Sequence, residues 1–221
     1  MRISKELLST YKTFDPESDL FFEIFDEPVS SKILEVGAQH SPISSLLAKS
    51  GFKVWGVDLR DSDQESHENY THITGDFCKL PNQFYKDHFG TFDCVVAVSS
   101  IEHFGLKTYG EQFGREYYDV TAMRYIYDLL KTGGVCYLVV PYGGKHVEVI
   151  PHWRVYSWAS FTDRLVQDFI IEDFNLKCTE KMSAPDRIIE PGESIDWGTA
   201  NMNTLGFPPY WGYLQVKKVR G

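Results

Sequence analysis

The sequence has no long hydrophobic run and little positive charge, and each shortage excludes a class of partner. No apolar stretch among its 221 residues is long enough to cross a bilayer, so we expect no membrane partner. It contains 22 Lys and Arg against 31 Asp and Glu, and its net charge of -9 opposes a phosphate backbone. We therefore expect no nucleic-acid partner, although residues 217–220 form a small basic stretch. The oligomeric state is left open.

Cysteine is scarce too, and its spacing is not that of a disulfide framework or a zinc site. The four cysteines lie far apart, and no two form a Cys-x-x-Cys pair. Cys94 and Cys136 fall in predicted buried strands. Residues 1–8 are amphipathic and lack the continuous apolar core of a signal peptide. We expect a cytoplasmic protein with reduced cysteines in its core.

Glycine is missing from a turn where dinucleotide-binding proteins need it. In residues 32–42 an apolar strand ends at Gly37, Ser41 is a suitable N-cap, and Pro42 suits the first helical position. This strand, turn and helix leave free backbone N–H groups above a sheet, where a polar or anionic ligand can bind. Gly37 is the single glycine of the turn, so the Gly-x-Gly-x-x-Gly pattern is absent. A pyrophosphate ligand is therefore disfavoured.

Apolar strands alternate with helices along the chain, which is typical of a doubly wound α/β domain. We expect a mostly parallel seven-stranded sheet with helices on both faces. The last two strands have no helix between them, so an antiparallel edge strand is expected. The predicted strands are 33–37, 53–58, 71–76, 92–99, 135–141, 169–176 and 212–219, and the predicted helices are 2–13, 17–27, 42–49, 82–88, 116–130 and 158–167.

The chain is long enough for one large domain, and we expect it to form a single domain over residues 1–221. Residues 1–30 are expected to form an N-terminal helical cap and residues 31–142 the ligand-binding core. Residues 143–221 are expected to contribute substrate-side loops and the antiparallel edge hairpin. The stretch 177–209 is too long for a simple connection and is a candidate loop over the substrate.

Polar residues follow the predicted strands at the sheet edge where α/β proteins bind ligands. Asp58 lies about 20 residues after the first turn, the spacing of an acid that hydrogen-bonds the hydroxyls of a ribose. Asp76 ends the third strand, and Ser99 to His103 follow the fourth. These positions suggest a nucleoside-containing cofactor.

Five motifs in this order resemble the class I S-adenosylmethionine-dependent methyltransferases over residues 32–142. The first is Ile33-Leu34-Glu35-Val36-Gly37, and the others are Val57-Asp58, Gly75-Asp76-Phe77-Cys78-Lys79-Leu80-Pro81, Phe92 to Ser99 with Glu102-His103, and Leu129-Leu130-Lys131-Thr132-Gly133-Gly134. The resemblance implies S-adenosyl-L-methionine as cofactor, bound by Glu35, Gly37, Gln39, Asp58, Leu59, Asp76, Phe77 and Ser99. Gln39 and Ser41 stand where that family usually has glycine. Residues 99–111 are also similar to methyltransferase-like proteins, some of them associated with saccharide biosynthesis.

His103 is the candidate general base, because an imidazole titrates near neutral pH. Its alternative role is a hydrogen bond to the loop backbone. Glu102 either orients that imidazole or contacts substrate, and its alternative is a solvated loop acid.

The segment after the fifth strand offers further polar side chains. His146, Glu148 and His152 are able, with His103, to form a divalent metal site, but their spacing matches no strong ligand signature and we expect no metal. We expect a substrate pocket to be lined by Arg154, Tyr156, Trp197 and Tyr210. Plain packing of a long loop is the alternative for the three aromatic residues.

These observations favour a methyltransferase acting on a small-molecule acceptor, by O-methylation of a sugar or secondary-metabolite hydroxyl. An acidic surface suits such an acceptor better than RNA or DNA. The alternatives are a non-catalytic methyltransferase-like module that binds a protein, and a nicotinamide-dependent oxidoreductase, which the missing glycines disfavour.

Overall fold

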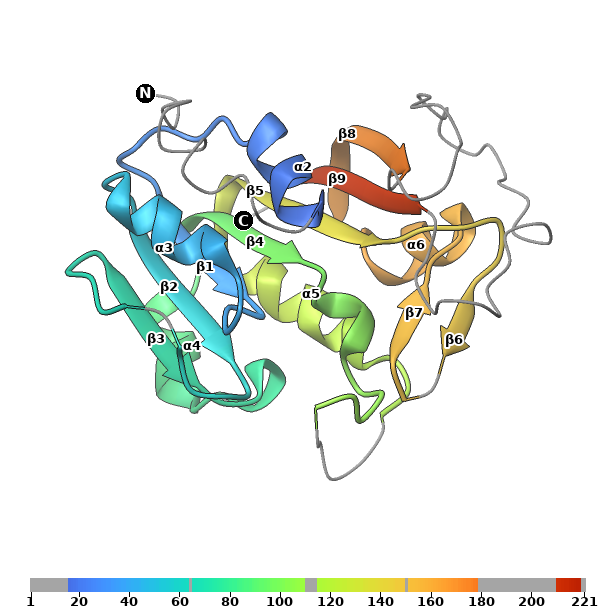
Figure 1. The fold of residues 1–221 in the computed structure, drawn as a ribbon, viewed down its shortest axis with the longest axis horizontal. Coiled ribbons are helices and arrows are strands. Elements are labelled where there is room, and N and C mark those ends of the chain that lie inside the picture. The colour runs from blue at the N-terminus through green and yellow to red at the C-terminus, as the bar shows by residue number, and fades with distance from the viewer. Residues whose placement is uncertain (1–15, 64, 110–114, 150, 179–209, 220–221) are drawn as a thin grey trace.

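The computed structural model describes residues 16–63, 65–109, 115–149, 151–178 and 210–219 (Figure 1). Its sheet has seven strands in the order β3-β2-β1-β4-β5-β9-β8. The first five strands are parallel, and β9 is antiparallel to both of its neighbours, which confirms the predicted fold class. The strands are β1 (Lys32–Val36), β2 (Lys53–Asp58), β3 (Tyr70–Thr74), β4 (Phe92–Val98), β5 (Leu130–Pro141), β8 (Phe169–Cys178) and β9 (Tyr210–Lys218).

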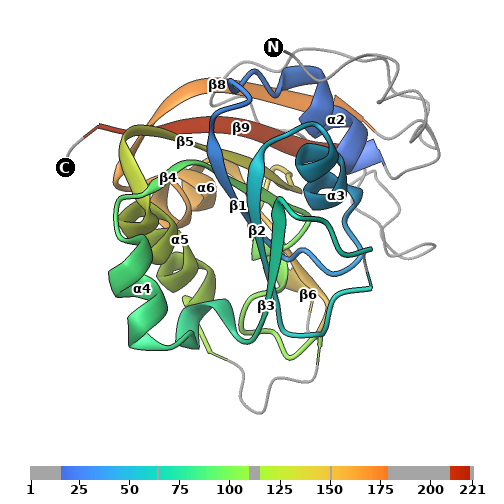
Figure 2. The same ribbon diagram turned by 90° about the vertical axis from the view of Figure 1, so that its left-hand side faces the viewer.

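Helices cover both faces of the sheet (Figure 2). Successive strand residues point to opposite faces, so Ile33 and Leu34 of β1 belong to two different apolar clusters. The Ile33 cluster includes Phe21 of α2 (Pro16–Ile24) and Leu47 of α3 (Pro42–Lys49). The Leu34 cluster contacts the other helices, which are α4 (Asn82–His88), α5 (Tyr118–Leu129) and α6 (Trp158–Arg164).

The turn after β1 folds as its sequence predicts. Ser41 is the N-cap of α3, its hydroxyl accepts a hydrogen bond from the Ile43 N–H at 3.1 Å, and Pro42 begins the helix. Gly51 directly follows Ser50, the C-cap of α3, and has a φ of +96°, a conformation that favours glycine.

The structure differs from the prediction around the loops. Residues 143–155, expected as loop, contain a two-stranded hairpin of β6 (Val147–Val149) and β7 (Trp153–Val155). Asp76 does not end β3; it caps the short 3-10 helix η1 (Phe77–Lys79). A second 3-10 helix, η2 (Ile101–His103), holds the residues after β4. The predicted helix over 2–13 and most of the loop 177–209 lie outside the described residues.

None of the helices described has both the length and the hydropathy that a bilayer crossing requires. Cys78, Cys94 and Cys136 are buried free thiols.

Candidate functional site

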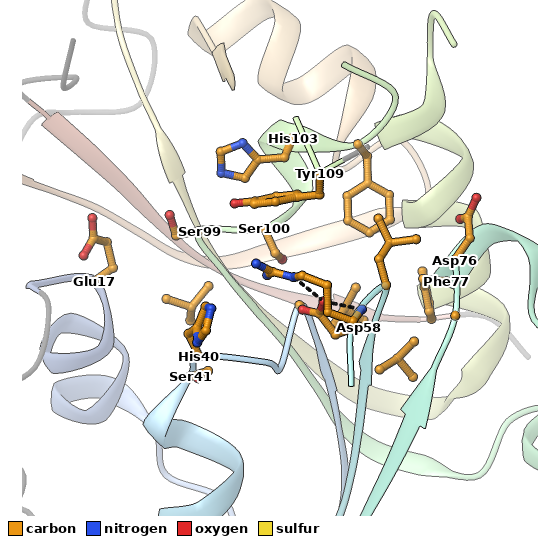
Figure 3. Close-up of a pocket in the computed structure, with 18 of the residues that line it drawn as sticks. Glu17, His40, Ser41, Asp58, Asp76, Phe77, Ser99, Ser100, His103 and Tyr109 are labelled. Atoms are coloured by element: carbon orange, nitrogen blue, oxygen red, sulfur yellow. Dashed lines mark hydrogen bonds and ion pairs between the residues drawn. The ribbon is translucent and has the colours of Figure 1, made fainter. Parts of the chain in front are cut away.

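A cavity of about 420 Å³ lies at the carboxyl ends of β1, β2 and β4 (Figure 3). This is the edge where open α/β sheets bind ligands. The sequence-predicted site residues that line it are Gly37, Asp58, Leu59, Asp76, Phe77, Ser99 and His103. Glu35, Gln39 and Glu102 are not part of that lining.

Gly37 brings the turn after β1 against the loop after β4. Its φ is +88°, and a Cβ placed there would lie 2.5 Å from the Cβ of Ser100. Such a distance is too short for two carbon atoms, so only glycine fits without a shift of one loop. The turn therefore forms a close-packed cradle at the cavity floor.

Asp58 presents its carboxylate at the edge of the cavity. The Gln39 N–H donates to Oδ2 at 3.1 Å, and the Arg60 N–H and Nε donate to Oδ1 at 3.0 and 3.1 Å. Each carboxylate oxygen can accept about two hydrogen bonds, so Oδ2 retains capacity for a hydroxyl donor. Gln39 thus contacts the site residue Asp58 through its backbone N–H, whereas its side-chain Oε1 is buried without a hydrogen-bond partner in the described part of the chain.

Asp76 and Phe77 form the opposite end of the cavity from His40 and Ser41 (Figure 3). Asp76 accepts hydrogen bonds from the Cys78 N–H at 3.0 Å and the Tyr118 hydroxyl at 2.7 Å. Its Oδ2 also pairs with Lys79 at 2.8 Å. Phe77 is 3% exposed. This end of the cavity therefore combines an apolar ring with a carboxylate whose charge is balanced by Lys79.

Glu35 lies beneath the loop and is 1% exposed. It accepts hydrogen bonds from the backbone N–H of Ser44 at 2.9 Å and from the Ser44 hydroxyl. Burial raises the pKa of Glu35 to about 7, against the opposing effect of hydrogen bonds from Ser41 and Ser44. Glu35 therefore supports the first turn of α3 and does not face the cavity.

His103 lines the cavity with a defined imidazole orientation. Its Nδ1 lies 2.5 Å from the carbonyl oxygen of His152. A carbonyl only accepts, so we assign the hydrogen of the neutral ring to Nδ1, which leaves Nε2 with a free lone pair. This is the form that a general base requires. The backbone hydrogen bond that the sequence offered as an alternative is thus present and compatible with catalysis.

Glu102 is close to that imidazole. Its Oε1 lies 3.8 Å from His103 Nε2 and accepts a hydrogen bond from the Ser99 hydroxyl at 3.1 Å. Glu102 is 1% exposed, so the alternative of a solvated loop acid is wrong. Burial raises the pKa of Glu102, and the hydrogen bond from Ser99 and the charge of Arg154 oppose that rise. Ser99 itself has a φ of +47°, a strained value that fixes the start of this loop.

The β6–β7 hairpin holds the His103 loop in place. The Thr108 hydroxyl donates to the His152 carbonyl oxygen at 2.7 Å, and Arg154 Nη1 donates to the Phe104 carbonyl at 2.5 Å. Arg154 Nε donates to Glu148 at 2.7 Å.

Arg154 and Tyr156 do not line a substrate pocket. They are 1% and 0% exposed, behind the loop. The hydroxyl of Tyr156 donates to buried Asp119 at 2.9 Å, and Arg164 donates to both oxygens of that carboxylate at 2.7 and 2.8 Å. Trp197 lies outside the described residues, as does the side chain of Tyr210.

Two of the side chains considered for a metal site have other contacts: Glu148 pairs with Arg154 at 2.7 Å, and His103 Nδ1 lies 2.5 Å from the carbonyl oxygen of His152. Within the described ranges, no three His, Cys, Asp or Glu side chains come together as a metal site requires.

Several lining residues were not predicted from the sequence. They include residues of α2, of the loops after β1 and β2, of the segment after η2 and of the start of α5, namely Glu17, Ser18, His40, Arg60, Tyr109 and Tyr118. Arg60 follows Asp58 by two positions, and Tyr109 lies in the stretch 99–111. Their positions in or beside these motifs could therefore have identified both residues from the sequence.

The family described as "Caenorhabditis protein of unknown function, DUF268" matches residues 52–175, more than half of the chain. No curated protein matches the sequence.

Solved structures share the fold at low sequence identity. A Burkholderia thailandensis 1,6-didemethyltoxoflavin-N1-methyltransferase, solved with bound 1,6-didemethyltoxoflavin and S-adenosylhomocysteine, is 13% identical with a TM-score of 0.62, over 98% of this chain and 82% of that one. A TehB-like SAM-dependent methyltransferase from Corynebacterium glutamicum is 15% identical with a TM-score of 0.55, over 97% of each chain. The [4+2]-cyclase SpnF is 15% identical with a TM-score of 0.59, over 92% and 81%. The resemblance to class I methyltransferases is thus confirmed for the fold.

Proposed function

The chain belongs to the DUF268 family and has the class I methyltransferase fold, and from this premise we propose that it is an S-adenosylmethionine-dependent methyltransferase. Its acceptor is a small molecule, methylated on a hydroxyl of a sugar or secondary metabolite. The observation that carries the proposal is the Asp58 carboxylate, which is fixed by the Gln39 N–H beside the Gly37 cradle. SpnF has the same fold but is described as a cyclase, so the function has to be argued from the residues of the site and not from the fold.

The residues of the cavity fit this cofactor. Asp58 would bind the ribose hydroxyls, while Leu59 and Phe77 would contact the adenine. The cradle at Gly37 would admit the methionine part close to the backbone. A cavity of about 420 Å³ is also within the usual size of a small-molecule site, roughly 300–1,000 Å³.

When bound, the cofactor supplies an electrophilic methyl group on a sulfonium. Held by Asp58 and the Gly37 turn, it would give this methyl group to the acceptor oxygen, and its sulfur would keep the electron pair of the broken carbon–sulfur bond. His103 Nε2 takes the hydroxyl proton, and the resulting positive charge lies 3.8 Å from Glu102 Oε1. Glu102 therefore stabilises the protonated base and keeps it oriented.

Calorimetric titration with S-adenosylhomocysteine tests the proposal. Asp58→Asn is expected to weaken binding by about ten- to a hundredfold, the contribution of a hydrogen bond to a charged group. Asp87→Asn is the matched control, because Asp87 is exposed on α4 and is not part of the cavity. Absence of binding to the unmodified chain, or equal binding by both variants, would contradict the proposal.

The second candidate is a non-catalytic module that binds a protein partner. It is favoured by Gln39 and Ser41, which replace glycine in the turn. Mass spectrometry of small molecules released from the purified protein separates the two: retained S-adenosylhomocysteine supports the enzyme, and its absence together with a captured partner supports the module.

A further inference from the structure

Arg60 is the one lysine or arginine among the described residues that line the cavity. Its backbone N–H and its Nε both donate to Asp58 Oδ1. Its guanidinium carbon lies 4.5 Å from the centre of the Tyr109 ring, as in a cation–π contact. These contacts hold the guanidinium at the cavity wall.

The outer edge of this guanidinium is unpaired. Nε is used by Asp58, but neither Nη1 nor Nη2 hydrogen-bonds to any residue in the part of the chain that the structure describes. The nearby acid Asp76 already has Lys79 as its cation at 2.8 Å. An ordered Nη edge matches the two oxygens of a carboxylate or phosphate.

Tyr109 lies next to both Arg60 and the candidate base. Its ring centre is 5.3 Å from that of His103, on the side of Asp58 (Figure 3). The two separations place the Arg60 guanidinium carbon within about 9.8 Å of the His103 ring. One small molecule can therefore contact both side chains.

We propose that the methyl acceptor carries an anionic group, a carboxylate or a phosphate monoester, that binds the Nη edge of Arg60 while its reacting hydroxyl lies at His103. This inference rests on the proposed function. A neutral acceptor would bury that edge without a partner, which costs free energy. An anion satisfies it with two charge-assisted hydrogen bonds.

The methionine part of the cofactor also carries a carboxylate, so the cofactor is the alternative ligand for the Nη edge of Arg60. Calorimetric titration therefore starts with S-adenosylhomocysteine and 5′-methylthioadenosine, which lacks that carboxylate. Arg60→Gln also loses the Nε contact with Asp58, so it is expected to weaken the binding of both ligands by a similar factor. If Arg60→Gln loses affinity for S-adenosylhomocysteine alone, the Nη edge serves the cofactor and the inference is overturned.

Acceptor probes are then titrated onto the full chain saturated with S-adenosylhomocysteine, using saturation-transfer NMR. The probes are glucose, glucuronate and glucose 6-phosphate, and the two charged probes separate a carboxylate site from a phosphate site. We expect one charged probe to bind at least tenfold more tightly than glucose. Arg60→Gln should lose that preference, whereas Arg124→Gln, which changes an exposed arginine of α5, should keep it.

Equal binding of charged and neutral probes, or no binding of either charged probe, would overturn the inference and leave the proposed function standing. Failure of the unmodified chain to bind S-adenosylhomocysteine would instead contradict the proposed function. Thermal unfolding of Arg60→Gln checks that the variant is folded, and Arg60→Lys, which keeps the charge but loses the planar fork, is expected to bind with intermediate affinity.

Discussion

The two sides of the cavity are held together differently. On the side of β2, Asp58 is fixed by the backbone N–H of Gln39 and by Arg60, two positions along the chain. On the side of β4, the His103 loop is fixed by residues about 50 positions later, through the His152 carbonyl and Arg154. The first arrangement forms with a local turn, whereas the second requires the whole domain to pack. We therefore expect the stability of the β4 side to depend more on buried charged side chains than that of the β2 side does.

The largest effect is expected from Arg154→Met. It removes the buried cation that contacts Glu148, the Phe104 carbonyl and, at 4.0 Å, the fully buried Asp119, and removing one partner of a buried ion pair costs about 3–5 kcal/mol. Urea-induced unfolding measures this loss. Arg124→Met, on the exposed face of α5, is the control and should change stability by less than about 0.5 kcal/mol. Similar unfolding curves for both variants would show that the hairpin does not depend on Arg154.

Glu35, in β1, makes the stability of the fold depend on pH. Its pKa is about 7 in the fold against 4.5 without burial, so the unfolded chain loses this proton at lower pH. The contribution of Glu35 to the free energy of unfolding is therefore fully present below pH 4.5 and is lost as the pH rises to about 7. The free energy of unfolding falls by about 3 kcal/mol over this range.

Glu35→Gln removes that titration, and we expect a flatter stability profile in urea unfolding between these pH values. The Ser44 hydrogen bonds remain available to the amide oxygen, so the variant should still fold. An unchanged slope would mean that another group is responsible.

Gly37→Ala and Gly133→Ala separate close packing from backbone strain. Both glycines have a positive φ, +88° and +81°, so both alanines are strained by roughly 1–2 kcal/mol. A Cβ at Gly133 meets nothing within 4 Å, whereas one at Gly37 meets Ser100. We expect Gly37→Ala to be less stable by a further 1–3 kcal/mol, roughly the cost of overpacking, and to bind S-adenosylhomocysteine more weakly. Equal losses would show that the cradle tolerates a methyl group.

The smallest effect is expected from Thr108→Val, which removes one of two donors to the His152 carbonyl. One net hydrogen bond corresponds to about 1 kcal/mol in urea unfolding. Thr162→Val is the control, since Thr162 bonds only within its own helix α6. ¹⁵N NMR of His103 should still show the hydrogen on Nδ1; a shift to Nε2 would mean that Thr108, and not His152 alone, sets the tautomer.

The sequence predicts best where contacts are local. The Ser41 cap and the position of Asp58 at the end of β2 follow from residues within one turn and from strand periodicity. The hairpin could not be predicted, because three-residue strands such as Val147–Val149 carry no periodic signal. The pairing of Arg154 with Glu148 and the Phe104 carbonyl depends on how distant elements pack, so Arg154 was wrongly expected in the pocket.

The strand order also constrains how the sheet is assembled. Since β9 lies between β5 and β8, strand β8 cannot join the sheet before β9 has paired with β5. During synthesis the backbone groups at the outer edge of β5 therefore stay without a strand partner until Tyr210–Lys218 has emerged. An open edge of this kind can pair with another chain. Late insertion of β9 is accordingly the step at which folding competes with aggregation.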